Sequence, residues 1–600
     1  MSALTDIRPE RWNHVLASQR INLWCIFIAA SVGLILAVIP HVHSFWLTGS
    51  FEYLADTDDV LYATIARRVV AGSWTVADHA APTALFAPST YAWLQFAPVG
   101  WLTGALGLSP PGFLLLWRII GGAALGISLF LLIRDALGRQ WQGRSRLLLA
   151  LSLALLCLAD PGFWRGVPLL NVPSVLSILD HGVYLRSNPG EYSQYRVLSP
   201  LTGLPLVFLL LWRILPDKGR DVQSAIIAGI ILGLLINLYF FFWTFAVVLL
   251  AAIGGWHLLR WLGSSDREVR SRCWSETKFC ALVLMIGMAI GAPQLFVTLK
   301  TAEVPTANEA LERTPRGIKL AADNPVRWQY AFNKPLVVSV AIGIVAASLL
   351  GVPALWTLVA ACAVATALQA SAAVTGIEFE NYKWGHVANT TGYLVLCLVA
   401  ANIAGRSRWL QFPFANGIAV TSLVLVTLAA VFIWRESLGT RESGSLMALN
   451  EEMRPLRSAL QALDPASRII GPEELVVAGI YARAGVLYGN HSFQSLISDE
   501  ELIERYSLSR WAMGLSEAEA LSGYPVGLPR DGRVLGEYRA RWNSASVEAQ
   551  VQKSFQSFGQ VDLDLYRVSA LLLQAGKEPP ARSGQWRKLG QTQQWVLWGR

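Results

Sequence analysis

The chain has 600 residues and a net charge of +8, with 54% of residues hydrophobic and only 15% charged. Soluble domains carry about 25% charged residues, so this composition excludes a purely soluble protein and favours a polytopic membrane protein with an additional soluble domain. The positive charge does not indicate nucleic-acid binding, because the excess Arg and Lys lies in short loops between apolar segments, where it fixes orientation in a membrane.

About eleven apolar segments are predicted to cross the membrane as helices. The first follows a polar N-terminal tail and is interpreted as a retained signal anchor, since a bilayer needs about 20 apolar residues. The predicted spans are 21–40, 112–133, 147–160, 200–213, 222–240, 242–262, 279–299, 335–350, 352–374, 390–404 and 414–434.

Short basic loops follow the second, fourth, sixth and tenth of these spans. The positive-inside rule places them in the cytoplasm, and the odd number of spans then places residues 435–600 outside. In that last part, β-like runs at 468–470 and 485–488 flank a helical pattern, which is a βαβ-like alternation. We predict a multi-pass protein of the bacterial inner (cytoplasmic) membrane, with a transmembrane domain (1–434) and a soluble extracytoplasmic α/β domain (435–600).

The predicted outer loops are longer and more varied in sequence than the inner ones, which indicates that the chemistry occurs on the outer face. These loops are 41–111, 160–199, 300–334 and 375–389. The first of them carries Asp56, Asp58 and Asp59 just after the first span, at a membrane–water boundary. Capping of an interfacial helix would explain one of these aspartates easily and three poorly. The acidic motif is therefore a candidate reaction site.

The run DDVLYATIAR at 58–67, followed by Gly72, resembles the D-[DE]-x-x-Y-A-x-I-A-R…G segment of the GT-C class of membrane glycosyltransferases. The likeness is greatest to the protein mannosyltransferase and aminoarabinose transferase branch, whose members use sugars carried on polyprenyl phosphate. It covers the first outer loop, and Asp59 stands where Glu is common; the rest of the chain is similar only in architecture. The resemblance implies a GT-C-like helical membrane fold and an inverting transfer.

The resemblance also assigns roles within the motif. Asp58 would be the general base, Asp56 and Asp59 would bind the acceptor or tune that base, and Tyr62 would contact substrate. An acceptor hydroxyl is a poor nucleophile at pH 7, and a carboxylate in hydrogen-bond reach can take its proton. No cofactor is then required. The alternative is that Asp56 and Asp58, spaced D-x-D, bind Mg²⁺ or Mn²⁺, as in the oligosaccharyltransferase variant.

The leaving group of such a transfer is an anionic phosphate, which needs cations, and arginine suits phosphate oxygens best. The other outer loops supply candidates. Snorkelling of these side chains to lipid headgroups is the competing explanation. The candidate donor-phosphate residues are His181, Arg196, Arg313 and Arg327.

The last outer loop packs acids, a lysine, a histidine and aromatic rings between two spans. Rings that stack on sugar C–H groups beside polar atoms make a sugar-binding surface, whereas an interfacial aromatic belt would explain only the rings. The candidate substrate-binding residues are Glu378, Glu380, Tyr382, Lys383, Trp384 and His386.

Taken together, these features predict transfer of a sugar from a polyprenyl-phosphate donor to a lipid, glycan or protein acceptor on the outer face of the membrane. One alternative is a lipid-linked glycan flippase or transporter, which needs ionisable residues along a path inside the spans. Arg118 is one such residue, but it has no continuous series around it. Another alternative is a non-catalytic envelope assembly protein, for which the aspartates would be dispensable.

Overall fold

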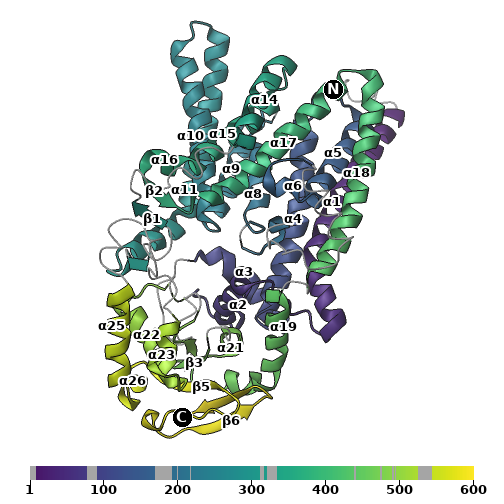
Figure 1. Ribbon diagram of the computed structural model, residues 1–600. Coiled ribbons are helices and arrows are strands. Elements are labelled where there is room, and N and C mark those ends of the chain that lie inside the picture. The colour runs from purple at the N-terminus through teal and green to yellow at the C-terminus, as the bar shows by residue number, and fades with distance from the viewer. Residues whose placement is uncertain are drawn as a thin grey trace, which may run out of the picture.

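The computed structural model describes residues 9–76, 91–168, 192–198, 200–216, 218–307, 309–310, 316–319, 334–437, 441–472, 476–489, 492, 495–523 and 544–600. A bundle of long apolar helices forms one part of the molecule, and a small sheet with surrounding helices forms the other (Figure 1). The chain is thus a polytopic α-helical membrane protein with a C-terminal α/β part, as the sequence predicts.

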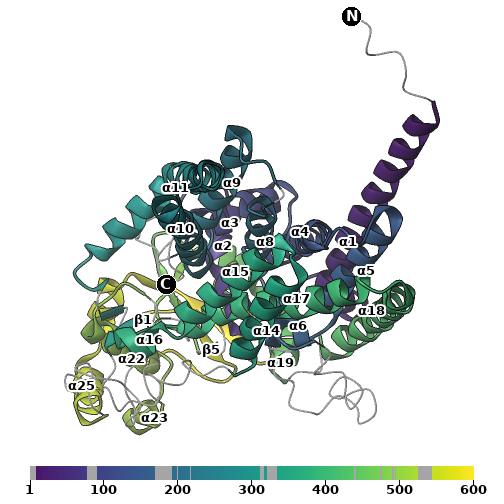
Figure 2. The ribbon, with the colours of Figure 1, turned by 90° about the horizontal axis from the view of Figure 1, so that it is seen from above.

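Each of the eleven predicted spans has one main helix, and the span predicted at 352–374 also covers most of the short helix α16 (Ser371–Thr375). Among the described residues, six helices are long and apolar enough to cross a bilayer, and four shorter apolar helices accompany them. The eleven helices are α1 (Pro9–Thr48), α4 (Gly112–Ala136), α5 (Gly143–Ala159), α8 (Leu204–Arg213), α9 (Val222–Ile236), α10 (Phe240–Gly263), α11 (Arg267–Ala302), α14 (Lys334–Leu350), α15 (Pro353–Gln369), α17 (Trp384–Gly405) and α18 (Arg408–Glu436). Seen from above, α9, α10 and α11 lie on one side of the bundle and α1, α5 and α18 on the other (Figure 2).

The basic loops between helices meet one another at one end of this bundle. Lys218 contacts Asp135 at 2.5 Å, and Arg220 pairs with Glu276 at 2.7 Å. Helix α11 has 36 residues, about 54 Å at 1.5 Å per residue, so it exceeds the ~30 Å hydrocarbon core. Its charged first third, 267–278, therefore extends beyond the predicted span.

Helices α1 and α4 pack at close range because small residues face each other. A Cβ atom at Gly126 would overlap the backbone carbonyl of Ala29, and one at Gly122 would lie 2.5 Å from the carbonyl oxygen of Gly33. Such small-residue contacts let membrane helices approach closely and gain van der Waals contact. The packing holds α1 beside α4, and the acidic motif follows α1 in the chain.

The predicted outer loops contain short elements, of which α2 and α3 lie between the bundle and the sheet (Figure 1). Helix α2 carries the acidic motif, and α3 packs against it in one hydrophobic core. These elements are α2 (Thr57–Val70), α3 (Trp93–Ala105), α6 (Gly162–Arg165), η1 (Ser193–Tyr195), β1 (Arg316–Lys319), α16 (Ser371–Thr375), β2 (Ile377–Phe379) and η2 (Asn381–Lys383). Strands β1 and β2 pair antiparallel, so two predicted outer loops are joined through their backbones.

The C-terminal part is built on a five-stranded sheet of order β4-β3-β5-β7-β6. Strands β3, β4 and β5 are parallel, and β5, β7 and β6 are antiparallel. The predicted βαβ unit is confirmed, with α21 between β3 and β4. The elements are α19 (Arg441–Met453), η3 (Arg454–Leu456), α20 (Arg457–Gln461), β3 (Arg468–Ile470), α21 (Val476–Tyr481), β4 (Gly485–Val486), α22 (Asp499–Ala512), α23 (Glu517–Ser522), α25 (Ser544–Ser557), α26 (Gln560–Leu565), β5 (Val568–Gln574), η6 (Ala581–Ser583), β6 (Arg587–Gln591) and β7 (Trp595–Gly599).

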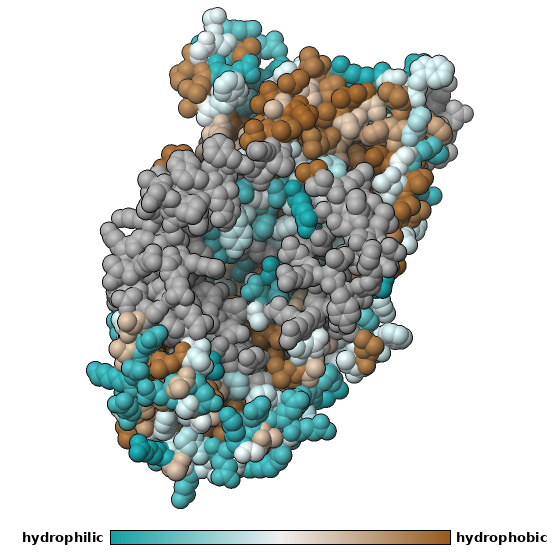
Figure 3. All heavy atoms as spheres, viewed as in Figure 1, coloured by the Kyte–Doolittle hydropathy of each residue, from teal (hydrophilic) through white to brown (hydrophobic). Residues whose placement is uncertain are grey.

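One hydrophobic core joins the C-terminal part to the first outer loop. It includes Leu61 and Val69 of α2, Phe96 of α3, Val477 of α21 and Leu572 of β5, all buried. Burial of apolar area is the main stabilising term in folding, at roughly 25 cal/mol per Å². The sheet and the helix with the acidic motif are therefore one packed unit, below the apolar surface of the bundle (Figure 3).

Candidate active site

The acidic motif opens helix α2, and its first aspartate caps that helix. Asp56 is the N-cap residue in extended conformation, and its Oδ1 accepts a hydrogen bond from the Asp59 backbone N at 3.0 Å. Carboxylates at this end also suit the helix dipole. Capping thus accounts for one carboxylate oxygen of Asp56, and its other oxygen contacts Arg196.

Arg196 bridges two of the three aspartates from the second outer loop. Its Nη2 lies 3.0 Å from Asp56 Oδ2 and 2.7 Å from Asp58 Oδ2. Burial of the guanidinium disfavours its charge, but the adjacent Asp56 and Asp58 outweigh this and raise the pKa of Arg196. The side chains of Arg196 and Asp58 remain 42% and 39% exposed, so a substrate can reach both. The structure thus places a predicted base beside a predicted phosphate-binding cation.

Asp59 faces the opposite way, into the protein. Its Oδ2 accepts a hydrogen bond from Arg118 at 2.9 Å and from the Ala55 backbone N at 2.9 Å, and the Asp59 side chain is 5% exposed. Burial raises the pKa of the Asp59 carboxyl, and Arg118 opposes that effect. Arg118 also donates to His41 Nε2 at 2.7 Å, while His41 Nδ1 donates to the Phe51 carbonyl at 2.6 Å. This placement favours a structural role for Asp59 over substrate contact.

Tyr62 lies one turn after Asp58 and belongs to the same electrostatic environment. Burial raises the pKa of Tyr62 well above its ordinary value, and Asp58, Tyr91 and Tyr239 add to the effect, while Arg196 opposes it. Tyr62 is therefore a neutral hydroxyl beside Asp58 that can donate or accept a hydrogen bond.

The predicted sugar-binding group of the last outer loop forms one cluster at the outer end of α17. Lys383 Nζ pairs with Glu380 Oε2 at 2.9 Å, and the Tyr382 hydroxyl lies 3.5 Å from Glu380 Oε1. The His386 ring stacks on Trp164 with centroids 4.0 Å apart, and Trp384 donates to Thr244 Oγ1 at 3.1 Å.

This cluster and the acidic motif share one electrostatic environment. The charges of both Lys383 and Arg196 act on the His386 ring. Hydrophilic atoms are recessed between the apolar bundle and the polar lower part (Figure 3). Two predicted outer loops, far apart in sequence, thus converge near Arg196.

Two residues of the site's loops have left-handed backbone conformations that are rare for residues other than glycine. Leu198, two residues after Arg196, has φ +64°, and Glu380 has φ +54°. Such conformations cost about 1–3 kcal/mol each and persist only where surrounding structure imposes them, often at functional sites. The loops that carry Arg196 and Lys383 are therefore held in fixed shapes.

Several predicted site residues cannot be placed in this site. His181, Arg313 and Arg327 lie outside the described residues, so their roles stay predictions. Glu378 lies in β2, and its side chain is likewise not described.

Sequence reasoning missed three aromatic residues near the site: Tyr91, Tyr239 and Trp164. Tyr239 opens an aromatic run, 239–243, at the junction of the predicted spans 222–240 and 242–262, and this run was an available signal. Trp164 stacks on His386 from α6, which no sequence pattern links to that loop.

A divalent metal would need oxygen ligands at the aspartates. No group of three or more His, Cys, Asp or Glu able to hold a metal occurs within the described part of the chain. Instead, Arg196 contacts both Asp56 and Asp58, so a cationic group already offsets part of the negative charge of the D-x-D pair. Mg²⁺ and Mn²⁺ prefer several carboxylate oxygens and water, and binding here would have to displace the guanidinium.

Comparisons with known proteins give structural similarities only. No family model and no curated protein sequence matches the chain. The chain is similar to ArnT from Cupriavidus metallidurans bound to undecaprenyl phosphate, with 13% identity and a TM-score of 0.48, over 96% of this chain and 97% of that one. The apo form of that protein gives 12% identity and a TM-score of 0.46, over 97% and 98% of the two chains. The Archaeoglobus fulgidus oligosaccharyltransferase tethered to an acceptor peptide gives 11% identity and a TM-score of 0.45, over 92% of this chain and 69% of that one.

Proposed function

We propose that this chain transfers a sugar from a polyprenyl-phosphate donor to a lipid, glycan or protein acceptor on the outer face of the membrane. The single observation that carries the proposal is the contact of Arg196 with Asp56 and Asp58. It joins a cation suited to phosphate and a carboxylate suited to proton transfer, at the end of the apolar helical bundle that faces the sheet.

The reaction balances with these groups alone. Asp58 takes the proton of the acceptor hydroxyl as the acceptor oxygen bonds to the sugar anomeric carbon. The bond from that carbon to the phosphate oxygen breaks, and its electron pair leaves with the polyprenyl phosphate. Arg196 stabilises the charge on the departing phosphate through charge-assisted hydrogen bonds. Attack opposite the leaving group inverts the anomeric centre, in line with the resemblance to GT-C enzymes.

The remaining polar cluster suits the sugar and the acceptor. Lys383, Tyr382 and His386 present donors and ring faces near Arg196, which is the composition of a sugar-binding surface. The flippase alternative receives less support, because Arg118 inside its span is paired with Asp59 and His41 and begins no ionisable path among the described residues.

Replacing Arg196 with Ala is expected to raise the KM for a polyprenyl-phosphate sugar about 10- to 100-fold, the equivalent of losing one or two charge-assisted hydrogen bonds. Arg196→Lys should recover part of the loss, because it keeps the charge but not the forked geometry. The measurement is the rate of sugar transfer by purified enzyme in detergent at varied donor concentration. Arg454, which is 47% exposed and paired with Glu451, is the matched control, and Arg454→Ala should be neutral. An unchanged donor KM in Arg196→Ala would refute a phosphate role for Arg196.

Chelation of divalent metal is expected to leave the transfer rate within about twofold of its starting value, because Arg196 supplies the charge that a metal would supply. The test is the same assay after dialysis against EDTA, with Mg²⁺ or Mn²⁺ added back to one sample. A rate that is lost on chelation and restored by added metal would show that a metal ion bound to Asp56 and Asp58, and not Arg196, supplies the positive charge.

A further inference from the structure

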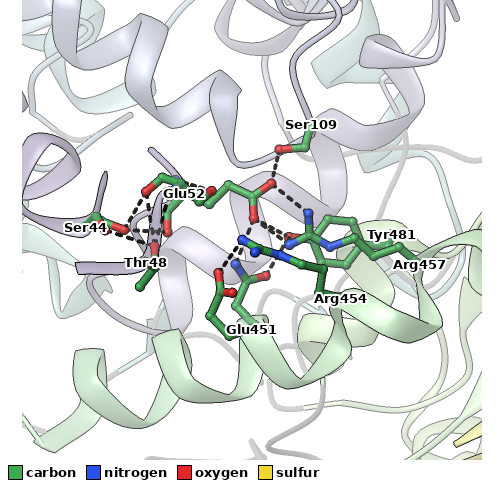
Figure 4. A network of polar contacts seen from close by, with 10 residues as sticks. Ser44, Thr48, Glu52, Ser109, Glu451, Arg454, Arg457 and Tyr481 are labelled. Carbon is green, nitrogen blue, oxygen red and sulfur yellow. Dashed lines mark hydrogen bonds and ion pairs between the residues drawn. The ribbon is translucent and has the colours of Figure 1, made fainter. Parts of the chain in front are cut away.

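A buried carboxylate outside the acidic motif joins the first outer loop to the C-terminal part. Glu52 lies between α1 and α2 and is 8% exposed (Figure 4). Arg457 donates to both of its oxygens, at 3.0 and 2.5 Å, and Asn450 Nδ2 donates to Oε2 at 3.0 Å. The Tyr481 hydroxyl lies 3.2 Å from the same oxygen, and Ser109 donates to the other. We call these five residues the Glu52 latch.

The Glu52 latch connects distant parts of the chain. Arg457, Asn450 and Tyr481 come from α20, α19 and α21, about 400 residues after Glu52. The Arg457 guanidinium also lies over the Tyr481 ring, 4.0 Å from its centroid. Burial disfavours the charge of Glu52, but Arg457, Ser109 and Asn450 outweigh this and lower the pKa of Glu52. The carboxylate is therefore held as an anion by directional contacts from several sides.

A second attachment lies on the other side of the acidic motif. Arg67, in the last turn of α2, donates from Nη1 to the Gly479 carbonyl of α21. Gly479 packs so closely that a Cβ atom there would lie 3.6 Å from Thr64 Cγ2 of α2 and 2.6 Å from a Val486 methyl. Helix α21 thus carries both Tyr481 of the latch and the carbonyl that binds α2.

The two attachments bracket Asp58. Glu52 precedes it by six residues and Arg67 follows it by nine, while the buried Asp59 holds α2 to Arg118 of α4. Buried ion pairs contribute little net stability, because desolvation offsets the Coulomb attraction, and an apolar pair of similar size would hold a domain equally well. The ion pair adds a defined geometry instead, because the two guanidinium nitrogens of Arg457 bind the two carboxylate oxygens of Glu52.

We infer that the C-terminal part is a positioning element for the transfer reaction, and that Glu52 and Arg457 are its positioning residues. This inference rests on the proposed function. The latch fixes the segment just before α2 and the Arg67–Gly479 contact fixes the last turn of α2, so that Asp58 keeps its distance to Arg196 and to the acceptor hydroxyl. A misplacement of about 1 Å at a reacting group can cost about 100-fold in rate.

The test compares Glu52→Gln with Glu268→Gln, a matched change of an 85% exposed carboxylate that pairs with Arg272 in α11. Glu52→Gln should lower kcat per folded molecule about 10-fold or more, with the donor KM within about twofold, because only the placement of the base changes. Glu268→Gln should leave both constants unchanged. Tyr481→Phe removes one hydroxyl but keeps the ring under Arg457, so it should fold and lower kcat by a smaller factor.

A double-variant cycle completes the test. Glu52→Gln and Arg457→Gln should be strongly non-additive in kcat, because either change alone breaks the same contact. An unchanged kcat in folded Glu52→Gln and Tyr481→Phe would overturn the inference. So would a rise in KM with constant kcat, which would make the C-terminal part a substrate-binding module. Absence of transfer by the wild-type protein would instead refute the proposed function itself.

Discussion

Replacing Asp58 with Asn is expected to lower the rate of sugar transfer by about 100-fold or more, with little effect on folding. The variant keeps the shape of the side chain and removes only the group that accepts the acceptor proton. Asp58 is 39% exposed and pairs with Arg196 at a partly solvated position, where an ion pair contributes ~1 kcal/mol or less to stability. The measurement is kcat of purified enzyme, with thermal unfolding in detergent as the check on folding.

The matched control is Asp266→Asn. Asp266 also caps a helix, α11, but it lies at the opposite end of the bundle and is exposed. Its variant should transfer sugar at the wild-type rate. A folded Asp58→Asn enzyme with more than about a tenth of wild-type kcat would exclude Asp58 as the base, since general-base catalysis contributes at least about 100-fold.

Replacing Asp59 with Asn is expected to have the opposite profile. It leaves the buried Arg118 guanidinium without its counter-charge, and removal of one partner from a buried ion pair costs about 3–5 kcal/mol. The variant should unfold at a clearly lower temperature and accumulate poorly in membranes. Its folded fraction, titrated by donor binding, should keep a donor KM within about twofold of the wild-type value, because Asp59 pairs with Arg118 and not with the phosphate-binding Arg196.

The double variant Asp59→Asn with Arg118→Gln tests the cause of that instability. Removing the orphaned charge should restore part of the lost stability, because both partners of the pair are then absent. Normal stability of Asp59→Asn together with loss of kcat would show that Asp59 acts on substrate, as the resemblance alone implied.

The helices and the βαβ unit were predictable because their signals are local. Apolar length determines a span, and the eleven predicted segments each match a helix. Strand β3 was predicted with its observed ends, Arg468 and Ile470, and the run predicted at 485–488 contains β4. The acidic motif was recognisable because its composition differs from everything around it.

The different roles of Asp58 and Asp59 were not predictable, because they depend on contacts with residues that are distant in the sequence. Asp58 and Asp59 are adjacent in sequence, but a helix turns successive side chains by about 100°, so one faces Arg196 and the other faces Arg118. The partners lie 138 and 59 residues away along the chain. Glu52 carried no sequence signal, because its partners lie in a part of the chain that packs against it only in the folded state.

Glycan and lipid profiling of cells that lack this protein tests the central claim most directly, when the cells are complemented with wild type or with Asp58→Asn. The account predicts that a glycosylated product disappears with the protein, returns with wild type and does not return with Asp58→Asn at equal abundance in the membrane. That product would also identify the donor sugar and the acceptor. Full restoration by Asp58→Asn would contradict the account and favour a transporter or an assembly protein.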